Sequence, residues 1–485
     1  AIAAVFDHPA VPAELADRFG ATVPVGAARD AIRALPVQGA ATIEIGPVRL
    51  EDLPVVRAAV AHRKCRVIVR AGSAEVAAEI APDVDRVIVG DAPDVVRLTD
   101  PSIAAAVAAL EDPSVTVLAT PAVLVAAGPG WFQRVIEARR AGADVPRLRE
   151  VGFDPRRWPA WVWGLVVGLA MIGGGLVAAA ITLGPVLLWY DRDFLGMQVA
   201  DVDAVNGRLV HFLQHDRITM AGAMVAIGIL YTGLAWGGIR RGWPWARNAY
   251  LISGLIGFPT LLYFLGTGFV EPLHTALAIV LFPMFLRATW RRPAIGRWTA
   301  AAEGPERERR RAATGQLLMI VTGVGLFAGG VVVSVVGLTG VFVPTDLEFL
   351  HVDAAVLERA NPLLAPFIAH DRAGFGGLLA STAAAITLLS MWGWRRGEAW
   401  VWWTLLGAAV AGFAPALLVH RGIDYTSFEH LLPVYLGVAF TGVALTLSRP
   451  FLCATPRGIR DDAVSRRREG ASSRIPRGSP FRILR

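Results

Sequence analysis

The sequence contains little cysteine, almost no lysine and little charge of either sign. Cys65 and Cys453 lie in different regions, so we expect neither a disulfide nor a cysteine metal motif. Lys64 is the only lysine, and no basic helix with interleaved aromatic residues accompanies the net charge of +7, so we expect no nucleic-acid partner. Charged residues make up 18% of the chain and hydrophobic residues 54%, which argues against an ordinary soluble enzyme and favours a membrane protein.

The apolar residues are concentrated after residue 158. Residues 1–157 have the composition of a soluble domain, and Asp7, His8 and Pro9 interrupt the first apolar residues, so no signal peptide is expected there. The runs that follow are each long enough to cross ~30 Å of hydrocarbon, which makes the lipid bilayer a partner. The predicted spans are 159–190, 218–239, 248–266, 272–289, 316–343, 373–394, 400–420 and 430–448.

The spans fall into two sets of four because one pattern occurs twice, 155 positions apart. His215-Asp216-Arg217 recurs as His370-Asp371-Arg372, and after one inserted residue His274 corresponds to His430. A repeat at a fixed period sets the architecture, here two four-span units. Further matches are Asp191 with Asp346, Asn206 with Asn361, Gly174-Gly175 with Gly329-Gly330, Arg240-Arg241 with Arg395-Arg396, Trp245 with Trp400 and Pro259 with Pro415.

Arginine counts predict the orientation of the spans. Segment 191–217 carries five Asp and three Arg, and 344–372 carries five acids and two Arg, whereas 287–311 carries eight Arg and three Glu. The positive-inside rule then places both termini in the cytoplasm, with the protein in the inner (plasma) membrane. Four spans per unit give both units the same orientation, about an axis along the membrane normal. We expect a cytoplasmic domain 1–157, membrane repeats 158–290 and 316–448, a basic cytoplasmic linker 291–315 and a basic, disordered tail 449–485.

The first domain alternates short β-branched runs with Ala-rich helical patterns, which is typical of buried parallel strands. A complete eight-fold barrel needs about 250 residues, so we predict a partial or eroded (β/α) barrel, or a small open sheet. The predicted strands are 2–6, 21–25, 41–46, 65–72, 85–91 and 116–120, and the helices are near 11–19, 28–35, 49–62, 74–81, 101–111 and 130–141.

Two stretches of this domain resemble dihydroorotate dehydrogenases. Residues 23–47, VPVGAARDAIRALPVQGAATIEIGP, are similar to that family's early strand, helix and strand, and 115–141 to its last barrel strand and Gly-Pro-Gly turn. In the family this turn holds the phosphate of FMN. The resemblance therefore implies Thr120, Gly128 and Gly130 as a phosphate site, FMN as cofactor and quinone as electron acceptor.

The domain also departs from the family's pattern. No asparagine precedes Asn206, although the family reads the pyrimidine with asparagines. The early loop is shortened to residues 26–30 and lacks the family's lysine, and Pro47 replaces a threonine. A site without hydrogen-bond partners for a polar ring loses most of its discrimination for that substrate. We therefore predict that the domain does not oxidise dihydroorotate.

Four histidines occupy matching positions in the two repeats. His215 and His370 open the second span of each unit, and His274 and His430 open the fourth. Within a four-helix bundle such pairs, His215 with His274 and His370 with His430, could converge on a metal ion or a haem iron. Two alternatives are a proton relay through the adjacent Asp, and plain helix-start residues with Asp216 and Asp371 as N-caps.

The sequence leaves three functions open. The first is a polytopic membrane protein whose duplicated domain is the working part, with a non-catalytic α/β domain. The second is a membrane-bound, FMN-dependent dehydrogenase that passes electrons to quinone. The third is a transporter of ions or small solutes. Few charged residues lie within the predicted spans, which argues against transport, and the missing asparagines and lysine argue against dehydrogenation.

Overall fold

A computed structural model describes residues 19–33, 42–61, 65–120, 122–123, 131–139, 147–291 and 305–454. The chain divides into two compact units, and each is described by itself. The described part of the first unit lies within Ala1–Ala141, and the second unit comprises Gly142–Arg297 and Pro305–Pro456.

The first unit contains a six-stranded sheet in the order β4-β3-β2-β1-β6-β5, in which every neighbouring pair is parallel. This is an open half-barrel, so the predicted partial barrel is confirmed at that level. The strands are β1 Phe19–Val23, β2 Thr42–Val48, β3 Arg66–Ala71, β4 Arg86–Val89, β5 Val95–Leu98 and β6 Thr116–Ala119. The helices are α3 Ala28–Arg33, α4 Leu53–Val60, α5 Ala74–Ile80, α6 Ile103–Ala109 and α8 Trp131–Arg139.

One strand differs from the prediction, and one predicted strand lies outside the described residues. Strand β5 was not predicted, because its four residues include Arg97 and resemble a loop. The predicted strand 2–6 lies outside the described residues, as does most of the predicted helix 11–19, whose last residue, Phe19, begins β1.

The sheet buries apolar side chains on both faces. Val67 and Val69 pack with helices α3 to α5 on one face, and the alternate residue Ile68 packs with Ile88 on the other. Glu44 of β2 is fully buried, accepts a hydrogen bond from Thr22 at 2.8 Å and pairs with Arg97 of β5. Two strands, β1 and β6, lie between β2 and β5 in the sheet, so this charged pair links two strands that share no backbone pairing.

The second unit contains eight helices that are long and apolar enough to cross a membrane, among the residues that the structure describes. This number confirms the predicted count and marks the chain as a multi-pass membrane protein. The helices are α9 Ala160–Leu183, α12 Leu209–Gly233, α13 Pro244–Thr260, α15 Pro272–Trp290, α16 Glu306–Leu338, α19 Leu364–Gly393, α20 Ala399–Gly422 and α21 Phe428–Leu452.

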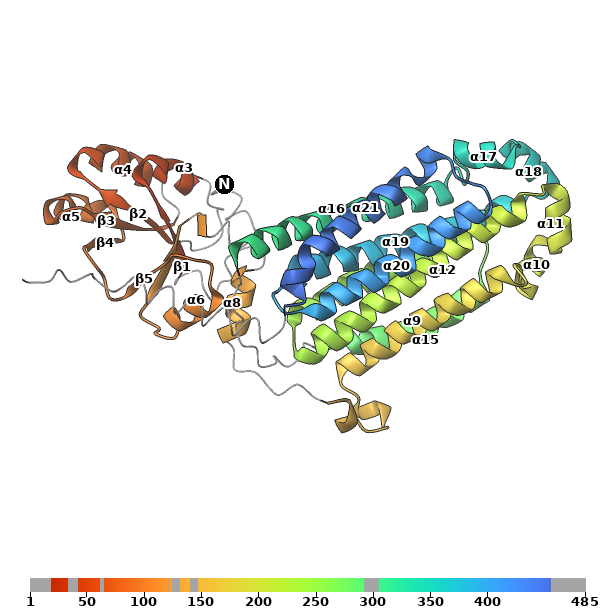
Figure 1. The fold of residues 1–485 in the computed structure, drawn as a ribbon, viewed down its shortest axis with the longest axis horizontal. Coiled ribbons are helices and arrows are strands. Elements are labelled where there is room, and N and C mark those ends of the chain that lie inside the picture. The colour runs from red at the N-terminus through yellow and green to blue at the C-terminus, as the bar shows by residue number, and fades with distance from the viewer. Residues whose placement is uncertain are drawn as a thin grey trace, which may run out of the picture. The chain divides into compact units, whose positions relative to one another are not determined.

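Helices α12 and α19 form the centre of this unit. The most apolar stretches of these two spans are 72% and 61% buried, against 22–33% in the other six. Helix α12 packs against α9 and α20, α19 packs against α16 and α13, and the two central helices touch each other (Figure 1). The third span of each set of four therefore packs on the second span of the other set. The eight spans therefore do not form two separate four-helix bundles.

Glycine allows the closest of these helix approaches. A Cβ atom on Gly175 of α9 would lie 2.8 Å from the carbonyl oxygen of Ala221, and one on Gly330 of α16 would lie 2.6 Å from the amide nitrogen of Ala380. A larger residue at either position would clash with the neighbouring helix. Small residues allow membrane helices to approach each other backbone to backbone. Both glycines belong to the Gly-Gly pairs that match in the two repeats.

The two long acidic connections contain short helices, which the sequence did not predict. They are α10 Trp189–Leu195 and α11 Val199–Val205 in one, and α17 Pro344–Leu350 and α18 Ala354–Ala360 in the other, grouped at one end of the unit (Figure 1). The connections hold each other: Asn206 donates to the Leu350 carbonyl at 2.8 Å, and Asn361 to the Leu195 carbonyl at 2.7 Å.

Covered by these short helices, the two central spans begin nine residues earlier than predicted, at Leu209 and Leu364. His215 and His370 therefore lie about two turns inside their helices and do not open them. The N-cap residues are Arg208 and Leu363, so the expectation that Asp216 and Asp371 cap these helices is wrong.

Candidate functional site

Arg217 of α12 is buried among carboxylates from both sets of spans. Its Nε donates to Asp371 of α19 at 2.7 Å, and its Nη1 lies 3.3 Å from Asp191 of α10. The same Nη1 donates to the Val186 carbonyl at 2.7 Å. Burial raises the pKa of Asp191, and the neighbouring Arg217 acts in the opposite direction.

Arg372 of α19 has the corresponding set of partners. It pairs with Asp346 of α17 and lies 3.5 Å from Asp216 of α12, and it donates to the Val341 carbonyl at 2.7 Å. Burial alone would raise the pKa of Asp346, but Arg372, the Val343 amide and the Tyr425 hydroxyl together outweigh burial and hold that pKa below its usual value. The Asp of each His-Asp-Arg motif thus pairs with the Arg of the other motif.

Each histidine of the two motifs adjoins a cluster of further metal-ligand side chains. Three ligand atoms from Glu271, His274 and His370 all lie within 4.8 Å of one another, and we call these residues the first triad. Three imidazoles, from His215, His420 and His430, meet the same criterion and form the second triad. Because Zn–N bonds are about 2.0–2.1 Å long, ligand atoms around one ion lie up to about 4 Å apart. Both triads are thus close to the size of a coordination sphere.

The first triad joins the start of α15 to α19. Glu271 is the N-cap of α15: it accepts from the His274 amide at 2.7 Å, and one of its oxygens lies 2.5 Å from His274 Nδ1. Tyr190 of α10 also bonds Glu271. Burial raises the pKa of Glu271, but the bonds from His274 and Tyr190 outweigh burial and lower it to about 2.

His370 completes the first triad from the other set of spans. Its ring centroid lies 6.1 Å from that of His274, and its Nδ1 is buried without a hydrogen-bond partner among the described residues. An orphaned buried nitrogen is costly unless something binds it. A metal ion between Glu271, His274 and His370 would satisfy this atom.

The second triad is all imidazole, and it too joins both sets of spans. His215 comes from α12, His420 from the last turn of α20 and His430 from the first turn of α21. The His430 and His420 Nε2 atoms face each other at 3.1 Å, and the His215 ring centroid lies 4.6 Å from that of His420.

Hydrogen bonds fix the outer nitrogen of each imidazole in the second triad. His215 Nδ1 lies 3.2 Å from the Phe212 carbonyl, and His420 Nδ1 lies 2.6 Å from the Ala416 carbonyl. A carbonyl can only accept, so both Nδ1 atoms carry the proton and both Nε2 atoms are unprotonated. His430 Nδ1 lies 3.3 Å from the Tyr425 hydroxyl, which itself donates to Asp346 at 2.8 Å. Metal-binding histidines are oriented in this way by their outer nitrogens.

The predicted partners of the four histidines are exchanged. The sequence predicted His215 with His274 and His370 with His430, whereas the structure groups His215 with His430 and His370 with His274. The reason is the packing of α12 and α19 at the centre, which brings the start of each beside the fourth span of the other set.

Sequence reasoning also missed Glu271 and His420. The repeat aligns Glu271 with Ser427 and His420 with Phe264, so neither shows the duplication that drew attention to the other histidines. The available signal was local: Glu271 lies three residues before His274, and His420 lies ten before His430.

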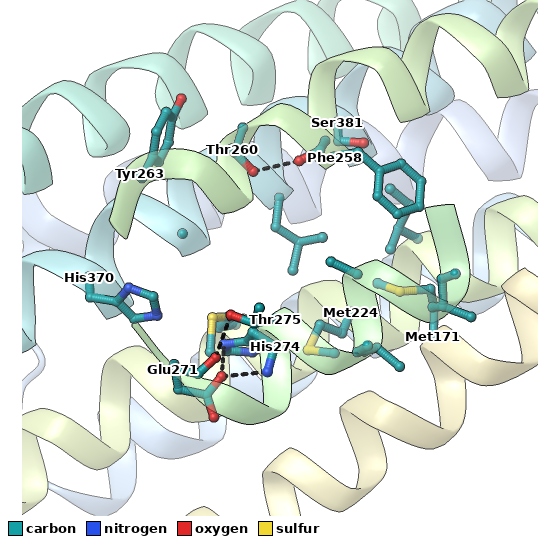
Figure 2. Close-up of a pocket in the computed structure, with 18 of the residues that line it drawn as sticks. Met171, Met224, Phe258, Thr260, Tyr263, Glu271, His274, Thr275, His370 and Ser381 are labelled. Carbon is teal, nitrogen blue, oxygen red and sulfur yellow. Dashed lines mark hydrogen bonds and ion pairs between the residues drawn. The ribbon is translucent and has the colours of Figure 1, made fainter. Parts of the chain in front are cut away.

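An apolar cavity adjoins the first triad. It contains about 980 Å³ of empty space, counting its open side, and lies between α9, α12, α13, α15 and α19. Glu271, His274 and His370 line one end, and Met171, Phe258 and Ser381 lie around the other (Figure 2). A second cavity of about 740 Å³ lies between α12, α16, α19, α20 and α21, and none of its lining residues is ionisable.

The proposed phosphate site of the first unit is only partly described. Thr120 is exposed, and its hydroxyl accepts from the Val123 amide at 3.3 Å, while Gly128 and Gly130 lie outside the described residues. Compared with protein-family models, curated proteins and solved structures, the chain matches none.

Proposed function

We propose that this chain is a multi-pass membrane metalloprotein that holds two divalent transition-metal ions, one in each triad. The observation that carries the proposal is the second triad, in which two buried imidazoles present unprotonated Nε2 atoms to a third. Ionisable side chains inside a membrane protein are expensive and are functional candidates by default. Six of them gathered into two ligand sets are better explained by bound ions than by helix starts.

The ligand types indicate the metals. Three imidazoles suit Zn²⁺, which accepts three protein ligands and one further group, and they suit Cu²⁺ as well. Two histidines with one carboxylate suit Zn²⁺ or Fe²⁺. A haem iron offers only axial positions, whereas each triad supplies three ligand atoms within 4.8 Å, which favours a small ion. A bound ion of this kind would act as a Lewis acid or a redox centre.

We further infer that the eight spans are two copies of one four-span unit in the same orientation. Contacts that recur at the repeat spacing of 155 support this inference. Arg217 and Arg372 each pair with the Asp of the other motif, and Asn206 and Asn361 each donate to a carbonyl of the other connection. The arginine-rich connections support cytoplasmic termini in the plasma membrane. Both triads would then lie toward the outer face.

The α/β unit serves in this proposal as an accessory domain that resembles, and no longer acts as, a dihydroorotate dehydrogenase. Its buried carboxylate, Glu44, is already paired with Arg97, and its Thr120 hydroxyl already accepts a backbone bond. No observation on the described residues favours FMN chemistry or transport, so neither is proposed.

Metal analysis of the purified full-length chain tests the proposal. We expect two equivalents of metal in the wild type, and about one in His215→Ala, in His420→Ala and in their double variant. His370→Ala should also retain about one, and the His215→Ala/His370→Ala double variant none. His211, exposed on the same helix as His215, is the matched control, and His211→Ala should retain two. A metal-free wild type, or a His420→Ala variant with both ions, would refute the proposal, and a Soret band would identify haem instead.

A further inference from the structure

The two triads differ in their access to empty space. The cavity beside the first triad is lined by all three of its ligands, whereas the second cavity contains no residue of the second triad. The two cavities correspond through the repeat, since Gly374 lines the first and Thr219 the second at matching positions. The first triad therefore opens onto a cavity, and the second triad lines neither of these two cavities.

The lining of the first cavity restricts the ligand that it can take. Most of its lining is apolar, as is usual for small-molecule sites. Glu271 is the only acidic residue among the described lining residues, and none is Lys or Arg. An anionic head group would therefore have only the proposed ion to pair with, and the carboxylate of Glu271 already offsets part of the charge of that ion.

Three hydroxyl groups of the lining are already used. Thr260 donates to the Gly257 carbonyl at 2.6 Å, Thr275 to the Glu271 carbonyl at 2.9 Å and Ser381 to the Ser253 carbonyl at 2.8 Å. The unpartnered polar atom at the cavity is His370 Nδ1, at the same end as the triad. A ligand thus meets a buried polar atom without a partner at that end, and the mostly apolar lining favours an apolar remainder.

We propose that this cavity binds a membrane-soluble molecule with a neutral oxygen head group, of the quinone or quinol type. The head oxygen reaches the open position of the metal held by Glu271, His274 and His370, and the apolar body lies against α9, α12 and α13. Catalytic metal sites leave such a position for a ligand, and structural sites do not. This inference rests on the proposed metal site and adds the class of its ligand.

Gly374 offers a way to fill the cavity without disturbing its walls. A Cβ atom at Gly374 would meet no atom within 4 Å, so the side chain of Gly374→Leu projects into empty space one helical turn from His370. Thr219→Leu makes the corresponding change in the second cavity and serves as the matched control. Should Gly374→Leu fail to fold, Ala278→Phe fills the same cavity from α15, with Val434→Phe as its control.

The experiment measures the binding of decylubiquinone to the purified full-length chain by equilibrium dialysis, with metal content determined on the same samples. We expect one site in the wild type, an affinity at least tenfold lower in Gly374→Leu with both ions retained, and wild-type binding in Thr219→Leu. In protein loaded with Co²⁺, the quinone should shift the visible bands of the wild type and leave those of Gly374→Leu unchanged.

The outcomes separate this inference from the proposed function. Two bound ions without quinone binding, or with equal binding to wild type and Gly374→Leu, would overturn the ligand and leave the metal sites standing. Equal losses in Gly374→Leu and Thr219→Leu would also overturn it, because the effect would not belong to the first cavity. A wild type without metal would refute the proposed function, and quinone binding to that protein would have to be explained without an ion.

Discussion

The ion pair between Arg217 and Asp371 should hold the two sets of spans together, and its coupling energy can be measured. Both side chains are buried, with 10% and 5% of their surface exposed, and the Nε to carboxylate distance is 2.7 Å. Removing one partner of a buried pair leaves an uncompensated charge, at a cost of about 3–5 kcal/mol. Asp191 still lies 3.3 Å from Arg217, so we expect Asp371→Asn to cost the lower figure, about 3 kcal/mol.

The double variant should cost less than the sum of the single ones. Arg217→Met alone leaves Asp371 and Asp191 without their cation, at about 3 kcal/mol. Because burial already raises the pKa of Asp191, this carboxylate can take up a proton and limit the cost. With Asp371→Asn added, we expect a total of about 4 kcal/mol and hence a coupling of about 2 kcal/mol.

The assay is a double-mutant cycle on the full-length chain, with reversible unfolding followed by circular dichroism in mixed detergent micelles. Arg372 and Asp216 form the matched pair, but their atoms lie 3.5 Å apart and make no hydrogen bond. Their coupling should therefore be smaller, about 1 kcal/mol. A coupling below about 0.5 kcal/mol for Arg217 with Asp371, or a larger value for the control pair, would refute the reasoning.

Three further predictions concern topology, acid stability and the α/β unit. A reporter active only in the cytoplasm should work when fused after Arg297 and fail after Val202, and a signal at Val202 would reverse the proposed orientation. Arg372 lowers the pKa of Asp346, so this carboxylate contributes stability above its unfolded pKa of about 3.9, and the contribution is lost as the pH falls through the lower folded value. Melting curves between pH 3 and 6 should therefore show less acid dependence in Asp346→Asn than in wild type, and identical slopes would contradict the assignment. The chain should not complement a pyrimidine auxotroph that lacks dihydroorotate dehydrogenase, and growth would show that the α/β unit retains that activity.

Hydropathy and periodicity along the sequence were sufficient to predict the membrane-crossing helices and the parallel strands. Eight apolar runs gave eight membrane-crossing helices, and alternating β-branched and Ala-rich stretches gave parallel strands with helices between them. The repeat identified four of the six triad residues, because a histidine that recurs at a fixed spacing is visible in one sequence. These features depend on neighbours in the chain, so the sequence alone could predict them.

Only the tertiary structure decided which residues meet. The first turns of α12 and α19 carry charges and resemble loops, but partners 26 and about 155 residues away bury and neutralise Arg217 and Arg372, which lets both helices begin nine residues early. Each third span packs against the central helix of the other set. As a result the histidines have partners other than the predicted ones, and Glu271 and His420 belong to the triads. Such pairings depend on contacts between distant segments, which a periodic pattern along one chain does not encode.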